Sequence, residues 1–295
     1  MSYGELVNEL KLEDRIIAVT RVSSQNEKLN DVGGCIYKSL GRVLAGETLV
    51  LGKGSCSCAG FDHNSGLKDE RPMIPGGFGV FLSKGSDQMW TPPGERFKCD
   101  PQTAEAMFEN LPKDVMGGFD AIKFEAYREG MKPDIVVILV DADQLSALLV
   151  LHGYHRSEYD SAIATTVSGC ASMLRIPFAE MKKERPKAVI TATDLAQRHF
   201  VDENLLALSV SGSDFEKMLS VTSECYFHSP VFKKYGEEFT RTRLWRRRGF
   251  QYLHNIQAAF CRAQGAAFYI SPVISLAAST NSSTSSGASL LYKSP

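Results

Sequence analysis

One stretch of the chain, residues 132–154 (KPDIVVILVDADQLSALLVLHGY), constrains the fold more than any other. It begins with an unbroken apolar run rich in β-branched residues, 135–140, which is bounded by Pro133 and by two aspartates. A run this short and this apolar is typical of a strand that is buried on both faces. Leucines then recur at helical spacing behind a capping aspartate, and Gly153 ends the segment. The stretch therefore predicts a buried strand that leads directly into a helix packed back onto it.

Similar patterns predict further elements on both sides of this unit. Strands are expected at 15–22, 47–51, 119–127, 188–192 and 205–210, helices at 2–12, 31–44, 100–111, 161–174 and 213–225, and a turn leading into a strand at 76–84. We therefore expect an α/β or α+β fold in which residues 1–236 form one domain, with helices flanking a mixed sheet. The crossover from Val140 through the helix near Asp143 favours at least one parallel pair of strands.

The composition changes at about residue 237. The segment RTRLWRRRGF is densely basic, and the last 25 residues contain eleven Ser and Thr without a clear period. Such a sequence buries too little apolar surface to offset the entropy lost on ordering. We expect residues 237–295 to form a disordered tail, and the alternative is that this stretch is not native sequence, for example because of a shifted reading frame.

The charge is distributed unevenly between the domain and the tail. Residues 232–262 hold eight Lys and Arg against two Glu, a net charge of +6, whereas residues 1–231 carry −8. An acidic domain gives no reason to expect nucleic-acid binding. If the tail is native, its basic stretch Arg241 to Arg248 with Trp245 is a candidate for binding nucleic acid or an acidic surface.

The compartment is expected to be the cytoplasm. No apolar run approaches the roughly 20 residues that a membrane helix needs, and the start, MSYGELVNELKLEDR, is acidic and lacks the apolar stretch of a secretory signal. The seven cysteines are an odd count. In a reducing compartment they are thiols, metal ligands or catalytic groups and not a disulfide framework.

Four of the cysteines form the strongest candidate site. Cys56 and Cys58 lie on a glycine-rich loop, residues 52–67 (GKGSCSCAGFDHNSGL), while Cys35 and Cys170 lie on predicted helices. Together they offer the soft ligands that zinc or an iron–sulfur cluster prefers. The alternatives are that Cys35 and Cys170 are small buried core residues, or that one thiol is a redox or nucleophilic group. The other three, Cys99, Cys225 and Cys261, have no partner in the sequence and are expected to be structural or incidental.

Four further residues are candidates for binding a polar ligand. Asp62 and His63 follow the cysteines on the glycine-rich loop. Asp194 and Arg198 lie in a charged segment where a guanidinium fork could orient a ligand, and the alternative is a charged turn on the surface. Neither GKGS at 52–55 nor GGFG at 76–79 has the spacing of a phosphate-binding loop.

The order of these motifs resembles a prokaryotic family known as domain of unknown function 169. The resemblance rests on PDIVVILVDADQLSALL at 133–149, on Cys35 followed by ETLVL and GSCSCAG, on SGCASML around Cys170, and on TATDLAQRHFVDENLLALSV and HSPVFKK further on. It covers about residues 10–236. The chain departs from the family pattern where Thr191 to Thr193 replace a cysteine, and where Cys-Ser-Cys replaces a single Cys followed by Pro. The resemblance implies a fold but brings no established activity with it.

Three hypotheses about function follow. The first is a metal or iron–sulfur centre held by Cys35, Cys56, Cys58 and Cys170, with a redox or binding role. The second is a non-enzymatic small-ligand binding or regulatory domain in which the 52–67 loop acts as a lid. The third is an enzyme with a cysteine nucleophile, in which one thiol reacts much faster than the others near neutral pH.

Overall fold

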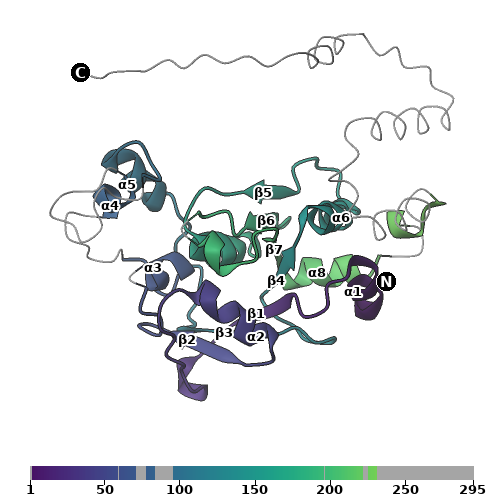
Figure 1. Ribbon diagram of the computed structural model, residues 1–295, viewed down its shortest axis with the longest axis horizontal. Coiled ribbons are helices and arrows are strands. Elements are labelled where there is room, and N and C mark those ends of the chain that lie inside the picture. Colours follow the sequence, from purple (N-terminus) through teal and green to yellow (C-terminus); the bar gives the residue numbers. More distant parts are fainter. Residues whose placement is uncertain are drawn as a thin grey trace, which may run out of the picture. The chain divides into compact units, whose positions relative to one another are not determined.

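The described strands form one seven-stranded sheet in the order β2-β3-β1-β4-β7-β6-β5 (Figure 1). This computed structural model describes residues 2–58, 60–70, 78–83, 96–195, 197–221 and 225–230. The strands are β1 (Ile16–Val22), β2 (Leu49–Gly52), β3 (Ala121–Ala126), β4 (Ile135–Val140), β5 (Ala162–Ala164), β6 (Ala188–Thr191) and β7 (Leu206–Ser211). The helices are α1 (Tyr3–Leu10), α2 (Leu40–Leu44), α3 (Phe61–Ser65), α4 (Phe78–Leu82), α5 (Pro101–Glu109), α6 (Ala142–Gly153), α7 (Ile176–Glu180) and α8 (Gly212–Leu219).

The strand β4 lies at the centre of the sheet, and all six of its residues are buried. The expected buried strand and the expected mixed sheet flanked by helices are therefore confirmed. The sheet contains a parallel pair, as expected, but this pair does not include β4. β4 pairs antiparallel with β1 and with β7, and among the described strands the parallel pair is β5 with β6. The crossover through α6 leads to β5, which runs parallel to β4 but is separated from it by β7 and β6.

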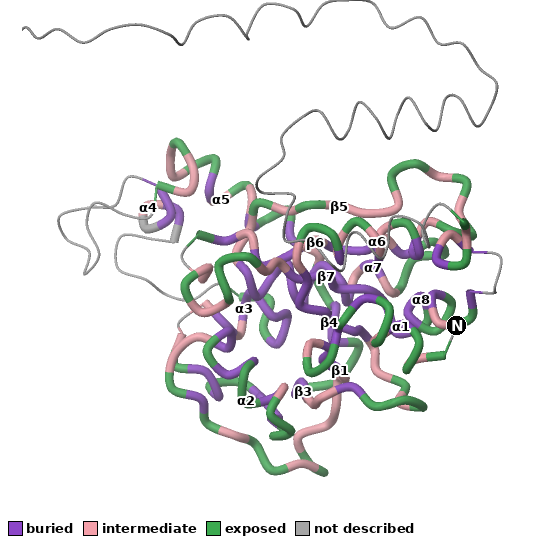
Figure 2. Tube along the Cα trace, turned by 45° about the vertical axis from the view of Figure 1, so that its right-hand side comes forward, coloured by how far each residue is buried: buried purple, intermediate pink, exposed green. Residues whose placement is uncertain are grey.

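The helices cover both faces of the sheet (Figure 1). Because side chains alternate along a strand, Ile135, Val137 and Leu139 point to one face, where they join a core cluster with Tyr37 and Phe178. The remaining side chains of β4 point to the other face, where α6 and α8 contact β4, β7 and each other. Figure 2 shows the buried residues concentrated along the central strands and on the inner sides of these helices.

Capping residues fix where two of the helices begin. Ser2 forms the expected capping box with Glu5 at the start of α1. Asp141 forms a second capping box with Gln144 at the start of α6, and Gln144 also donates to the carbonyl of Leu10. These contacts tie α1 to the end of the central strand. Among the described helices, none is long and apolar enough to cross a membrane.

Four predictions of secondary structure were wrong in part. Residues 78–82 form the helix α4 where a strand was expected, and residues 76, 77 and 84 lie outside the described residues. The predicted helix 31–44 is not helical before Ile36, where a short 3-10 helix begins. In the predicted helix 161–174, the strand β5 comes first and helical backbone starts only at 169. The helix α8 begins at Gly212 and ends at Leu219, and not at Ser213 and Cys225.

The tail predicted at 237–295 lies outside the described residues. The fold lies within a compact unit, Met1–Ser229, that is distinct from residues 230–295. The boundary at residue 236, the disorder of the tail and the question of whether it is native sequence therefore stay predictions.

Gly212 allows α8 to pack against the segment that enters β4, and this gives a testable prediction. A Cβ atom at this position would clash with the carbonyl oxygen of Pro133. We expect Gly212→Ala to lower the free energy of unfolding by about 1–3 kcal/mol, because the backbone must shift to relieve the overlap. Gly41 in α2 is the matched control, since a Cβ there meets nothing within 4 Å. Gly41→Ala should raise the stability by up to about 1 kcal/mol, and equal effects of the two substitutions in urea unfolding would contradict the packing.

Candidate functional site: a cluster of four cysteines

Backbone pairing brings the first cysteine segment against the glycine-rich loop. Val32 forms an isolated parallel β-bridge with Cys56. The Val32 N–H donates to the carbonyl of Ser55 (2.7 Å), and the Ser57 N–H donates to the carbonyl of Val32 (3.3 Å). Cys35 lies only three residues beyond Val32, as the cap residue of the 3-10 helix Ile36–Ser39 and not inside a helix as predicted. The loop that carries Cys56 and Cys58 therefore lies alongside the segment that carries Cys35.

Tyr37 links this region to the third cysteine segment. Its hydroxyl lies 3.2 Å from the carbonyl oxygen of Gly169, to which it donates, and 3.1 Å from Oγ1 of Thr191. Cys170 follows Gly169 directly. Ser172 extends the network, because its hydroxyl lies 2.6 Å from Thr191 Oγ1 and also donates to Gly169. These hydrogen bonds hold residues that are far apart in the sequence together on the face of the sheet that carries Ile135 and Val137.

The four candidate cysteines lie in the same core cluster. Cys56 and Cys170 are buried members of it, while Cys35 and Cys58 are partly buried and pack against it. Burial raises the pKa of Cys170 well above its usual value, and the neighbouring Cys35, Cys58 and Cys56 raise it further. Burial also raises the pKa of Cys56 to about 12, again with contributions from Cys58 and Cys35. The pKa of Cys35 is raised by burial and by Cys58. The four thiols therefore lie in the same part of the core.

The charged segment after β6 reaches the same cluster. Asp194 is buried, accepts a hydrogen bond from the Gly169 N–H (3.1 Å), and its charge contributes to the raised pKa values of Cys35 and Cys170. Arg198 donates to the carbonyl oxygens of Ala192, Leu205 and Glu203. Its guanidinium therefore holds the turn between β6 and β7.

The other two candidates lie at the base of the loop. The carboxylate of Asp62 accepts from the Gly54 N–H at 3.1 and 3.2 Å and so closes the glycine turn. His63 is buried in α3, where Nδ1 lies 3.1 Å from the carbonyl of Asp69. Ligand binding by Asp62, His63, Asp194 and Arg198 stays a prediction.

The remaining cysteines do not belong to this cluster. Cys99 is exposed and donates to Asp100, and Cys225 is buried at the start of a 3-10 helix. Cys261 lies outside the described residues. Among the residues that are described, no group of three His, Cys, Asp or Glu side chains is arranged so that it could hold a metal ion. The four thiols are therefore neighbours without the close spacing of a ligand set.

Two backbone features at the cluster had no signal in the sequence. The helix that follows Cys170 is a π-helix, Ala171–Arg175, a rare conformation that often lies at functional sites. Ala192 adopts a left-handed conformation, with φ of 61°, which is unfavourable for a residue with a Cβ. Tyr37, Ser172 and Thr191 also had no signal, since only the folded chain brings their hydroxyls together.

The hydroxyl of Tyr37 gives a prediction about how this region is held. Tyr37→Phe should lower the free energy of unfolding by about 1–2 kcal/mol, because it removes two buried hydrogen bonds and leaves Thr191 with one partner fewer. Tyr3→Phe is the matched control, since the Tyr3 hydroxyl makes one long, half-exposed hydrogen bond (3.4 Å). Urea unfolding that gives the same small change for both variants would contradict the role of Tyr37.

The fold and the site together define a mixed α/β domain in which a cluster of cysteine thiols packs against one face of the sheet. The sequence profile of domain of unknown function 169, described as "Uncharacterised ArCR", matches residues 5–221. The chain belongs to this family, as the resemblance implied. No curated protein and no solved structure matches the chain.

Proposed function

We propose that this domain binds a soft metal ion or an iron–sulfur cluster through Cys35, Cys56, Cys58 and Cys170. The observation that carries the proposal is that three separate chain segments place four thiols in one core cluster. Thiolates are the preferred ligands of zinc and of iron–sulfur clusters. The donor type therefore fits such a group. The thiols of the described residues are not close enough together to coordinate one ion. Binding therefore requires Cys56 and Cys58 on the loop to turn toward Cys35 and Cys170.

The electrostatics of the cluster support a cation as the ligand. Without a compensating charge, burial and mutual repulsion keep Cys35, Cys56 and Cys170 protonated. A divalent cation replaces those protons and stabilises several thiolates at once, so binding should release protons. The role then depends on the group that is bound. An iron–sulfur cluster would supply one-electron redox chemistry, whereas zinc would stabilise the loop.

The same electrostatics give less support to a cysteine nucleophile. A nucleophilic cysteine needs a lowered pKa, which usually comes from a nearby cation or a helix N-terminus. The one cation that contributes to the pKa of Cys35 is Lys38, and its effect is smaller than that of burial. A thiol enzyme is therefore less well supported than a metal-binding domain.

Metal analysis of anaerobically purified protein tests the proposal. We expect stoichiometric iron or zinc in the wild-type protein, and visible absorption if the metal is an iron–sulfur cluster. Cys56→Ser or Cys170→Ser should abolish metal binding, because each removes one of at most four ligands. Cys99→Ser is the matched control, because Cys99 is exposed and outside the cluster, and it should retain the metal.

Two results would overturn the proposal. The first is a folded, colourless wild-type protein that contains neither iron nor zinc and takes up neither metal when it is supplied anaerobically. The second is one thiol of the cluster that alkylates far faster than Cys99 at neutral pH, which would favour the thiol enzyme. Circular dichroism of each serine variant separates loss of ligand from loss of fold.

A further inference from the structure

A second candidate site lies on the opposite side of the sheet from the cysteines. A cavity of about 200 Å³ lies between the end of α6, the start of α8 and the turn that contains Glu184 and Arg185. Its lining is mainly polar and includes His152, His155, Arg156, Arg185, Asp214 and Lys217. The cavity does not involve the cysteines, so it is independent of the function proposed above.

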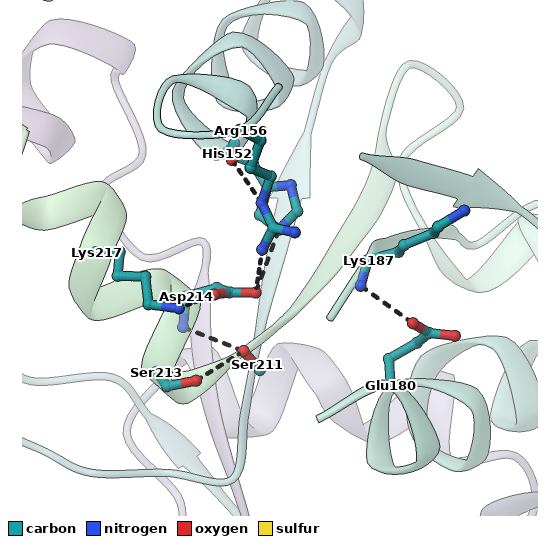
Figure 3. Close-up of polar contacts among 8 residues, drawn as sticks. All are labelled: His152, Arg156, Glu180, Lys187, Ser211, Ser213, Asp214 and Lys217. Carbon is teal, nitrogen blue, oxygen red and sulfur yellow. Dashed lines mark hydrogen bonds and ion pairs between the residues drawn. The ribbon is translucent and has the colours of Figure 1, made fainter. Parts of the chain in front are cut away.

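Two basic side chains in the lining of this cavity share one carboxylate. Arg156 and Lys217 both bind the single carboxylate of Asp214, at 2.7 Å and 2.9 Å. Figure 3 shows His152 reaching Asp214 from the end of α6, Arg156 from the segment that follows α6, and Lys217 from α8. The Asp214 side chain is 2% exposed, so this carboxylate is shielded from water. Two cations therefore share one buried carboxylate, Arg156 from a side chain that is 13% exposed and Lys217 from one that is 62% exposed.

His152 adds hydrogen-bonding capacity that the described residues do not use. Its side chain is 1% exposed, and Nε2 lies 3.5 Å from the Asp214 carboxylate. Nδ1 is buried and has no hydrogen-bond partner among the described residues, whereas Nε2 faces the Asp214 carboxylate. A buried polar atom without a hydrogen-bond partner destabilises the fold, so a ligand that supplies the partner is stabilised at this position. Arg156 likewise uses Nε and Nη2 on His152 and Asp214, while Nη1 has no partner in the described part of the chain.

The lining also contains two further acidic residues. Glu158 is paired with Arg185, and Glu184 is exposed. The most buried donors that face the cavity are His152, which is 1% exposed, and Arg156, which is 13% exposed. We propose that the cavity binds a small anion, with its carboxylate or phosphate group held by Arg156, Lys217 and His152. Carboxylate and phosphate share this recognition chemistry, because a guanidinium fork matches both.

Calorimetric titration of the full-length protein at constant ionic strength tests this proposal. Inorganic phosphate and succinate are the two probes, and they distinguish a phosphate from a carboxylate ligand. We expect saturable binding of at least one of them with a stoichiometry of one. Lys217→Gln should weaken that binding about tenfold or more, because it removes a charged donor. His152→Gln should weaken it as well, and its thermal unfolding shows whether the buried position is still intact.

Lys132→Gln is the matched control for charge. Lys132 is exposed and pairs with Glu216, also on α8 but outside the cavity lining, so this variant should bind like the wild type. Equal weakening in the Lys132 and Lys217 variants would indicate non-specific charge effects and would overturn the proposal. Absence of saturable binding of both probes at concentrations up to about 10 mM, which corresponds to a very weak interaction, would also overturn it.

Discussion

Replacing Arg175 with methionine is expected to lower the free energy of unfolding by about 3–5 kcal/mol. Arg175 is buried in the π-helix after Cys170, with 1% of its side chain exposed. It donates to the carbonyls of Pro112 (2.5 Å) and His63 (2.5 Å) and to the carboxylate of Asp69 (2.7 Å). Methionine fills a similar volume but satisfies none of these acceptors, so three segments lose their common donor.

Two further variants separate the causes of this effect. Arg175→Lys keeps the positive charge but not the planar guanidinium fork. We therefore expect it to lower the free energy of unfolding, but by less than Arg175→Met does. Arg42→Met is the matched control, because Arg42 is paired with Glu47 but half exposed. The effect of this substitution should be much smaller than that of Arg175→Met, because exposed ion pairs contribute little to stability. A loss below about 1 kcal/mol for Arg175→Met in urea unfolding would contradict the role of this residue as a buried link.

The second large effect is expected at Asp214 and depends on pH. Burial alone would raise the pKa of Asp214, but its contacts with His152 and Lys217 and the charge of Arg156 outweigh burial and lower the pKa to about 2. A carboxyl group with a lowered folded-state pKa stabilises the fold above its unfolded pKa of about 3.9. This contribution, about 2–3 kcal/mol, is lost as the pH falls from about 5 through 2.

The substitution Asp214→Asn removes this titration. At pH 7 the variant should be less stable than the wild type by about 2–3 kcal/mol, and the difference should shrink as the pH falls toward 2. Asp160→Asn is the matched control, since Asp160 forms a half-exposed pair with Lys187. This control should change stability much less than Asp214→Asn does, because exposed ion pairs contribute little. The stability difference between Asp214→Asn and the wild type is measured by urea unfolding from pH 7 to pH 3. If this difference does not change with pH, the lowered pKa of Asp214 does not stabilise the fold.

The sequence predicted the elements whose signals are local. The apolar run of β4 and the aspartate that caps the following helix specify structure through their immediate neighbours, and both predictions were confirmed, with Asp141 as the cap. The helix α4 was missed because its stability comes from close packing on α5, where Gly79 lies against Pro101 and Glu105. Ser211, and not Ser213, caps α8, because the strand β7 runs to Ser211 and the helix begins at the next residue.

The candidate site was predictable in its residue types but not in its contacts. Cysteines on separate segments indicated a cluster, and the β-bridge from Val32 to Cys56 and the hydroxyl of Tyr37 are what bring those segments together. These contacts join residues up to 154 positions apart, so no local pattern encodes them. The buried Arg175 and the pocket around Asp214 were missed for the same reason, since burial of a charged residue depends on the whole fold.

Zinc titration of the reduced apo-protein, with mass-spectrometric mapping of thiol alkylation, tests the central claim most directly. If the four cysteines bind one metal, Cys35, Cys56, Cys58 and Cys170 should become protected together at one equivalent of zinc. Cys99, which is exposed, should remain reactive throughout and serves as the internal standard. Alkylation of all four at rates that do not change when zinc is added would contradict the claim that they form a metal-binding site.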